Sequence, residues 1–239
     1  MKSNVLVHEL GAYFEILSGR LRQHSATIDK FIGDGLLAFF NAPADVPQHE
    51  NKACRAAIIA LEELALRQKE GKMVPFRTRV GLHTGDVLVG NIGTPERFAY
   101  TVLGDVVNVA SRLEALNKIY GTQILASHDV HDAAGNDFEW RHLDRVSVFG
   151  RKGTVDIYEL MGLKEGVDED RLRVRKVYEE ALDLYFTRSL WDARRLFGEV
   201  AEKMPGDKAA LLMMTRCDHL LSQEVPENWD GVFVYNFKS

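Results

Sequence analysis

Two short apolar runs, residues 26–32 and 36–40, are separated only by Gly33-Asp34-Gly35. A Gly-flanked turn between two apolar runs is typical of a hairpin of two strands. Between residues 5 and 24, before this pair, apolar side chains recur every three or four positions, which predicts an amphipathic helix. The chain therefore opens with a helix and a hairpin, and its fold has to combine both kinds of element.

The following segments alternate between helical and strand-like patterns. We expect two further helices, at 50–70 and 105–120. Strand-like patterns occur at 76–82, 87–92, 123–126, 138–148 and 154–160. This order lacks the regular βαβ rhythm of a doubly wound sheet, so we expect an α+β fold, a mixed sheet with helices packed on one face.

A charged segment marks the expected domain boundary. Between residues 164 and 180, 11 of 17 residues are charged, which is typical of a solvated linker that leads into a new helix. We therefore expect a first domain over residues 1–162. Residues 163–239 then form a linker and a small all-α helical hairpin, with a further helix over 208–222.

The spacing of Ala181, Ala193, Phe197 and Pro205 resembles the small–Ala–Phe–Pro positions of one tetratricopeptide repeat. A plain helical hairpin with an apolar core stripe is the alternative. One repeat cannot bury its own faces well, so we expect the tail to dock on the first domain or on a partner. The apolar, aromatic segment 229–235 should pack in the same way.

Composition excludes several classes of protein. Lys and Arg number 30 against 35 Asp and Glu, giving a net charge of −5, which argues against a nucleic-acid partner. Cys54 and Cys217 are too few for a disulfide framework, so we expect a cytoplasmic location. No apolar run approaches the roughly 20 residues of a membrane-spanning helix.

The first candidate for chemistry is the turn carboxylate of Asp34. A carboxylate between two apolar strands stays solvated or meets a cation, and the flanking glycines allow close approach of a ligand. Lys30 lies two residues before Ile32 on the same strand face, so Lys30 and Asp34 are expected to flank one pocket. An ordinary Asp-Gly hairpin turn is the alternative.

The second candidate is a pair on the helix at 105–120. Asn108 and Arg112 are four residues apart and therefore share one face. An amide and a guanidinium on one face can hold a polyphosphate, because arginine offers a rigid fork of donors to phosphate oxygens. The alternative is a surface arginine paired with Glu114 or another neighbour.

Three strings occur in order along the chain: Lys-Phe-Ile-Gly-Asp-Gly at 30–35, Arg-Val-Gly-Leu-His-Thr-Gly at 79–85, and Leu-Gly-Asp-Val-Val-Asn-Val-Ala-Ser-Arg-Leu at 103–113. In this order they resemble the class III adenylate/guanylate cyclase catalytic domain, from about residue 5 to about residue 160. The resemblance implies a ferredoxin-like α+β domain that works as a dimer with active sites at the interface. It also implies conversion of a nucleoside triphosphate to its cyclic 3′,5′-monophosphate and pyrophosphate with two divalent metal ions, Mg²⁺ or Mn²⁺.

The resemblance assigns roles to five residues. Asp34 matches one of the family's two metal-binding aspartates, and Lys30 matches the residue that hydrogen-bonds the purine. Thr101 falls where many members have Asp and some bacterial ones have Thr. Guanylate cyclases typically carry Glu and Cys at these two positions, so Lys with Thr implies ATP. Asn108 matches the residue that orients the ribose, and Arg112 the one that stabilises charge in the transition state.

This sequence departs from the family's pattern in three places. The family's other metal aspartate lies on a strand before the first helix, in a Phe-x-Asp-Ile-x-x-Phe-Thr-like string that is absent here, so we expect the first strand to be missing and activity to be impaired. Phe149 stands where many members have a basic residue that reaches the phosphates. Arg151 or Lys152 is expected to substitute. Asp86 also occupies a position where some members have a basic residue.

We therefore expect an adenylate cyclase domain that acts as a homodimer. The tail resembles the C-terminal extension of bacterial cyclases whose parent is anchored in the inner membrane by an upstream sensor. The alternatives are a non-catalytic homologue that binds a nucleotide or only dimerises, a guanylate cyclase, and a tetratricopeptide interaction module. His128 and His131 show no third metal ligand in the sequence, so we expect them to be surface residues, and we expect His83 to be structural.

Overall fold

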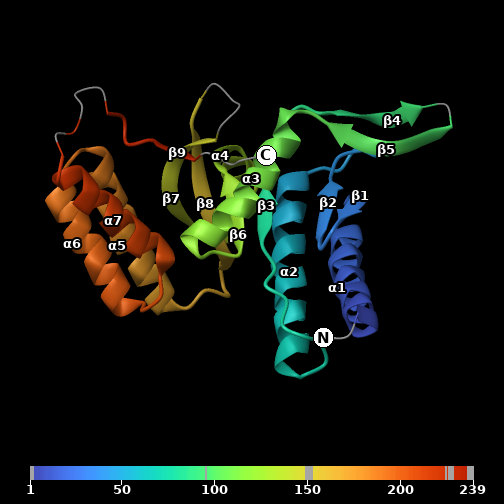
Figure 1. Cartoon of the computed structure of the whole chain (residues 1–239), viewed down its shortest axis with the longest axis horizontal. Coiled ribbons are helices and arrows are strands. Elements are labelled where there is room, and N and C mark those ends of the chain that lie inside the picture. The colour runs from blue at the N-terminus through green and yellow to red at the C-terminus, as the bar shows by residue number, and fades with distance from the viewer. Residues whose placement is uncertain (1–2, 95, 149–152, 224, 226–228, 236–239) are drawn as a thin grey trace. The chain divides into compact units, whose positions relative to one another are not determined.

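The computed structural model describes residues 3–94, 96–148, 153–223, 225 and 229–235 (Figure 1). Backbone contacts group the chain into two compact units. The first comprises Met1–Thr78, Thr84–Asn108 and Asp132–Asp137, and the second comprises Arg79–His83, Val109–His131 and Phe138–Ser239. The expected division at residue 162 stays a prediction.

In the first unit, helices α1 (Ser3–Gln23) and α2 (His49–Lys69) pack on each other. Their contact buries a small core, which consists of Tyr13, Leu17, Ala60, Leu64 and Met73. Strands β1 (Thr27–Ile32) and β2 (Gly35–Phe39) form the expected antiparallel hairpin. Gly33 in its turn has φ 61°, a conformation that glycine adopts without steric cost.

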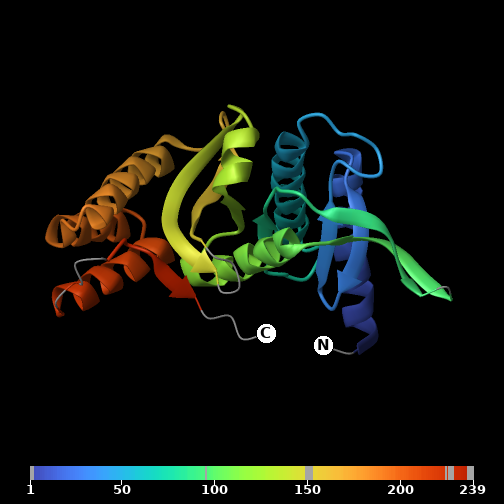
Figure 2. The same cartoon turned by 90° about the horizontal axis from the view of Figure 1, so that it is seen from above.

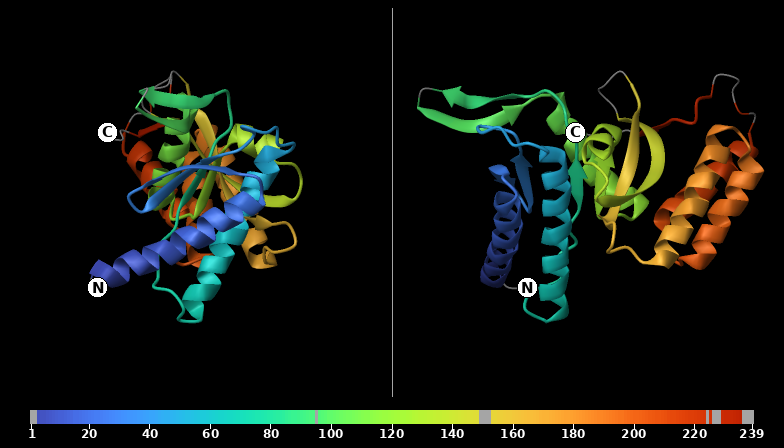
Figure 3. Two further views of the ribbon diagram at one scale, coloured as in Figure 1. Left: turned by 90° about the vertical axis from the view of Figure 1, so that its right-hand side faces the viewer. Right: turned by 180° about the vertical axis from the view of Figure 1, so that it is seen from behind.

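A second two-stranded ribbon completes the first unit. Strands β4 (Leu88–Thr94) and β5 (Arg97–Leu103) pair antiparallel in an unbroken register from Leu88 opposite Leu103 to Thr94 opposite Arg97. The ribbon reaches outward beyond α1 and α2 (Figures 2 and 3). Strand β5 was not predicted, although Phe98, Tyr100 and Val102 stand at every second position, and most of its side chains are exposed.

The second unit is built on a five-stranded mixed sheet in the order β3-β6-β8-β7-β9. Its strands are β3 (Val80–Leu82), β6 (Ile124–Ser127), β7 (Phe138–Val148), β8 (Val155–Leu163) and β9 (Phe233–Tyr235). Strands β3 and β6 pair in parallel, as do β7 and β9, and the other neighbours are antiparallel. With its helices, this sheet confirms the expected α+β fold.

Helix α3 (Asp105–Tyr120) has the predicted bounds, and the short helix α4 (His128–Ala133) follows β6. Gly81 on β3, the first glycine of the Arg-Val-Gly-Leu-His-Thr-Gly string, has no room for a side chain. A Cβ at Gly81 would lie 2.1 Å from the carbonyl oxygen of Ala110 and 2.4 Å from the amide nitrogen of Glu114. Helix α3 therefore packs directly on the backbone of β3.

The tail contributes helices α5 (Glu169–Phe186), α6 (Leu190–Lys203) and α7 (Lys208–Leu221) to the second unit. Figure 3 shows the three helices packed together. Their buried side chains belong to one cluster with those of α3 and the sheet, and β9 pairs with β7, so the tail shares a core with the sheet. None of the helices in the described part of the chain is both long and apolar enough to span a bilayer.

Candidate functional site

The structure brings Lys30 and Thr101 together. Lys30 lies on β1 and Thr101 on β5, 71 positions later, and the Lys30 Nζ donates a hydrogen bond of 3.0 Å to the Thr101 Oγ1. Thr101 is 6% exposed, whereas the Lys30 side chain is about half exposed. A solvent-reaching ammonium thus meets a buried hydroxyl, which places a donor and an acceptor side by side.

A third residue joins this pair, and the sequence prediction missed it. The Thr101 Oγ1 donates to the Asp29 Oδ2 at 2.7 Å, and the Asp29 Oδ1 lies 3.5 Å from the Lys30 Nζ. The Asp29 side chain is 1% exposed. The available signal was a carboxylate inside an apolar strand, immediately before Lys30.

A β-bulge explains how two consecutive residues reach the same partner. Adjacent side chains on a regular strand point to opposite faces. The register of β1 with β2 shifts here, since Ile28 faces Ala38 while Lys30 faces Leu37. Asp29 therefore has no facing residue of its own, and a bulge of this kind can re-aim a side chain.

Asp34 lies at the turn between β1 and β2 and is exposed. Within the described part of the chain it makes no hydrogen bond and no ion pair. Its carboxylate is thus available to a cation. No group of three potential metal ligands among the described residues includes Asp34.

Helix α3 carries Asn108 and Arg112 one turn apart on one face. Asn108 is exposed, Arg112 is half-buried, and neither makes a side-chain hydrogen bond or ion pair among the residues that the structure describes. Glu114, the partner considered for Arg112, pairs instead with Arg79 at 3.0 Å. The guanidinium of Arg112 is therefore not used by the fold. Phe149, Arg151 and Lys152 lie outside the described residues.

The first unit also exposes a set of large apolar side chains. Phe98 on β5 is 63% exposed. The others lie on β1 and on the β4–β5 ribbon or next to it, and they are Phe31, Ile32, Val87, Leu88, Tyr100 and Leu103. Such a concentration of exposed apolar residues is typical of an interaction surface. Strand alternation puts Leu88 and its partner Leu103 on one face of the ribbon and Phe98 and Tyr100 on the other. We call these seven residues, which include both faces of the ribbon, the apolar surface.

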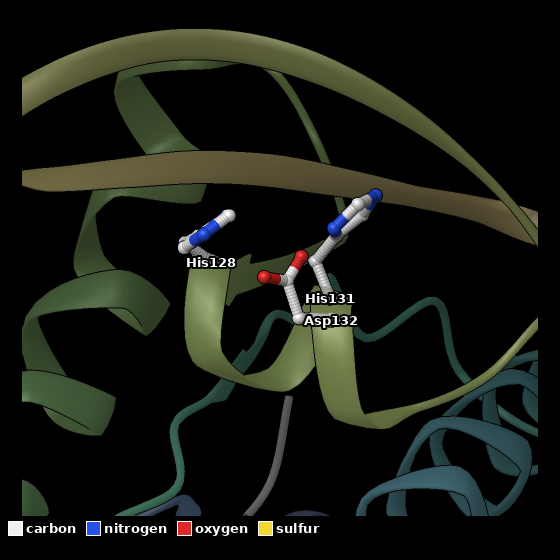
Figure 4. A group of neighbouring side chains, drawn as sticks. All are labelled: His128, His131 and Asp132. Atoms are coloured by element: carbon white, nitrogen blue, oxygen red, sulfur yellow. The ribbon is translucent and has the colours of Figure 1, made fainter.

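His128 is exposed and His131 is half-buried, in agreement with the expected surface position, but Asp132 supplies a third potential ligand that was not predicted. The ligand atoms of the three residues all lie within 4.8 Å of one another (Figure 4). The His131 ring also stacks on Tyr158, with ring centroids 4.2 Å apart. His83 is buried and its Nδ1 lies 2.7 Å from the Ser127 Oγ, which agrees with a structural role.

A cavity of about 280 Å³ lies in the second unit and contains none of the predicted site residues. Arg141 lines it and bonds with both Glu159, at 2.8 Å, and Asp207, at 2.5 Å. Its charge is therefore already balanced within the fold.

Comparison with known families matches residues 3–162 to the adenylate and guanylate cyclase catalytic domain. Adenylate cyclase 1 of Rhizobium meliloti is 40% identical over 166 residues, which cover 68% of this chain and 25% of that protein. The terminal-differentiation-specific adenylate cyclase of Dictyostelium discoideum is 33% identical over 213 residues, covering 87% of this chain and 10% of that protein. The chain thus spans a quarter or less of these two relatives.

Solved structures show the same fold. The guanylyl cyclase Cya2 superimposes with a TM-score of 0.61 and 30% identity, over 70% of this chain and 86% of that one. The adenylyl cyclase CyaB from P. aeruginosa gives a TM-score of 0.61 and 27% identity, over 70% of this chain and 88% of that one. The family match ends at residue 162 and gives no support to the tetratricopeptide assignment of the tail.

Proposed function

Because the chain belongs to the adenylate and guanylate cyclase catalytic domain family, we propose that it makes cyclic AMP and pyrophosphate from ATP. Membership of the family supports cyclic nucleotide synthesis. The choice of ATP rests on one observation, the hydrogen bond of 3.0 Å between the Lys30 Nζ and the Thr101 Oγ1.

This pair complements the edge of adenine. Adenine offers an amine donor beside a ring-nitrogen acceptor, whereas guanine offers a carbonyl acceptor beside a ring N–H donor. The Lys30 ammonium can only donate, and the Thr101 oxygen has a lone pair left to accept. Guanine would therefore place its ring N–H, a donor, next to the Lys30 ammonium, which is also a donor.

In the proposed reaction the ribose 3′-oxygen forms a bond to the α-phosphorus, and the bond from that phosphorus to the pyrophosphate oxygen breaks. The proton of the 3′-hydroxyl is released to solvent. We assign to Arg112 the stabilisation of the negative charge that develops on the phosphoryl oxygens. The assignment is supported by its guanidinium having no partner among the described residues. To Asn108, one turn before it on α3, we assign the role of orienting the ribose. We keep Arg151 and Lys152 as candidates for holding the triphosphate.

Class III cyclase domains use divalent metals, and we propose Mg²⁺ or Mn²⁺ here with Asp34 as a ligand. One carboxylate does not fit a two-ion site, which needs several anionic ligands. Among the described residues, Asp34 belongs to no group of three potential metal ligands. For this reason no step is assigned to a metal ion, and we expect weak activity from the chain.

We further propose that the domain acts as a homodimer. The support is the apolar surface, where Leu88 and Phe98 each leave about two thirds of their area exposed. Covering such side chains is favourable, at about 25 cal/mol per Å². A second copy of the chain presents the same surface and can cover it symmetrically.

The test uses the purified chain with ATP or GTP and Mg²⁺ or Mn²⁺. We expect tighter binding of ATP than of GTP, with a low yield of cyclic AMP. Lys30→Glu should weaken ATP binding and favour GTP, because a carboxylate accepts where the ammonium donates. Lys52→Glu, the same charge change on α2, is the control and should leave the preference unchanged.

Three results would contradict the proposal or part of it. Tighter GTP binding, with cyclic GTP as the product, would make the chain a guanylate cyclase, the activity named for the 30% identical Cya2. Failure to bind either nucleotide would favour a non-catalytic homologue. Turnover of several per second, abolished by Asp34→Ala, would overturn the expectation of impaired activity.

A further inference from the structure

Asp29 carries a buried carboxylate that no role described above uses. Its side chain is 1% exposed, and its Oδ1 has no hydrogen-bond partner among the described residues. A buried ionised group is costly unless it is paired, so such a residue in an apolar strand needs a reason. Its two neighbours are Lys30 and Thr101, the residues proposed to recognise the base.

The hydrogen bonds around Thr101 have a fixed direction. A threonine hydroxyl has one hydrogen to donate and two lone pairs that accept. The Lys30 Nζ donates to the Thr101 Oγ1 at 3.0 Å, and the Thr101 hydroxyl donates to the Asp29 Oδ2 at 2.7 Å. An ionised carboxylate can only accept, so the single hydrogen of Thr101 is committed to Asp29.

We propose that Asp29 is a positioning residue that sets the preference for ATP over GTP by holding Thr101 as a pure acceptor. This inference rests on the proposed function. With its hydrogen committed, Thr101 can accept from the adenine amine but cannot donate to the guanine carbonyl. Without Asp29, the hydroxyl could rotate and donate, and the pair would tolerate both bases.

The local backbone supports this role. The bulge between Ile28 and Lys30 lets consecutive side chains reach the same hydroxyl. Burial keeps water from replacing the carboxylate as the acceptor. Gly90, opposite Thr101 on β4, has no heavy atom within 4 Å of where its Cβ would be. Paired residues of antiparallel strands share a face, so space for a ligand is open beside Thr101.

Asp29→Asn is the informative variant because it keeps the size of the side chain. The Asp29 Oδ1 lies 3.5 Å from the Lys30 ammonium, so the amide oxygen should occupy that position. The amide nitrogen then faces Thr101 and donates to it. The Thr101 hydrogen is released toward the base, and the preference for ATP should fall about tenfold, the worth of one well-placed hydrogen bond.

The experiment measures dissociation constants of ATP and GTP for the purified chain, with excess Mg²⁺, by competition against a fluorescent ATP analogue. The variants are Asp29→Asn, Thr101→Val and the double variant, with the exposed Asp45→Asn as the control. Thermal unfolding is recorded for each variant. If Asp29 acts through the Thr101 hydroxyl, Asp29→Asn should not change the ATP-to-GTP ratio in the Thr101→Val background.

A roughly tenfold fall in the ratio that disappears in the double variant supports the inference. An unchanged ratio in a folded Asp29→Asn chain that still prefers ATP overturns the inference and leaves the proposed function standing. An equal fall with and without the Thr101 hydroxyl also overturns it, because Asp29 would then act by another route. Failure of the unmodified chain to bind either nucleotide overturns both.

Discussion

Two sets of polar residues in this protein differ in how the fold satisfies their charges and hydrogen-bonding groups. In the first unit, Asp34 and Asn108 are exposed and make no side-chain hydrogen bond within the described chain. In the second unit, Arg216 and Asp144 form a buried ion pair. Groups satisfied inside the fold contribute to structure, whereas groups that the fold leaves unsatisfied are available to a ligand.

The buried cluster joins the tail to the sheet. Asp144 on β7 also accepts from the Tyr120 hydroxyl at 2.5 Å, and Arg216 on α7 donates to the Tyr235 hydroxyl at 2.5 Å. Burial, with the nearby Asp144 charge, raises the pKa of Tyr120 well above its ordinary value, so this hydroxyl remains a donor. The network connects α3, β7, α7 and β9 inside one core.

The largest expected effect comes from breaking this network. Arg216→Ala leaves the Asp144 carboxylate buried without its cation, which typically costs about 3–5 kcal/mol. For a chain of this size that corresponds to a fall of about 10 °C in melting temperature. Arg194→Ala, which removes an arginine that pairs with Asp218 at the surface, should have no measurable effect. Equal melting temperatures for the two variants would show that the network is not structural.

Arg112, which also has no side-chain partner among the described residues, should show the reverse behaviour. Arg112→Ala removes a cation that the fold does not use, so the melting temperature should stay unchanged. Cyclic AMP formation should fall about 100- to 1,000-fold, as for the loss of one group that stabilises transition-state charge. Lys118→Ala, on an exposed position of the same helix, is the control. A lower melting temperature for Arg112→Ala would show that Arg112 contributes to the stability of the fold.

The apolar surface offers a third test, because its exposed side chains are proposed to be buried by a second copy of the chain. Phe98→Asp places a charge on this surface and should weaken self-association about 10- to 100-fold, since burying one such side chain is worth about 1.5–3 kcal/mol. Sedimentation measures the change. Trp191→Asp is the control, because Trp191 is 73% exposed on α6 and lies outside this surface. Equal effects of the two variants would remove the support for this dimer surface.

The smallest effect concerns pH. A hydrogen bond with His142, and the charge of Arg145, hold the pKa of Asp156 below its usual value near 4. A depressed carboxyl pKa contributes stability above the unfolded pKa, and this contribution is lost as the pH falls through the folded pKa. Urea unfolding should therefore show Asp156→Asn less stable than the unmodified chain at pH 7, with the difference shrinking below about pH 4. A difference that does not depend on pH would contradict this assignment.

Much of the local structure could be predicted from the sequence. The helices at α1, α2, α3 and α7 lie within two residues of their predicted bounds. Apolar spacing alone identifies such elements, because a helix buries every third or fourth residue. Strand β5 was not predicted although Phe98, Tyr100 and Val102 alternate along it, and its burial does not follow that alternation. Residues 76–79 were wrongly included in β3.

The candidate site also contains residues that the sequence predicts and one that it does not. The motif strings identified Lys30, Asp34, Asn108 and Arg112 as functional candidates, since these polar residues stand at fixed places beside glycines and apolar positions. They could not reveal Asp29, because its role depends on a bulge, and strand alternation would send it away from Lys30. The tail's helices were predictable, but the parallel pairing of β9 with β7 was not.

The sequence alone therefore predicts the hairpin, the main helices and the functional groups of the site: an amine, a carboxylate, an amide and a guanidinium. These follow from backbone geometry over a few residues, which repeats every 3.6 residues in a helix and every two in a strand. Only the tertiary structure decided that Thr101 meets Lys30 and Asp29 across 71 positions of sequence. That meeting depends on where strands lie side by side and on one irregular residue, and neither is encoded in local periodicity.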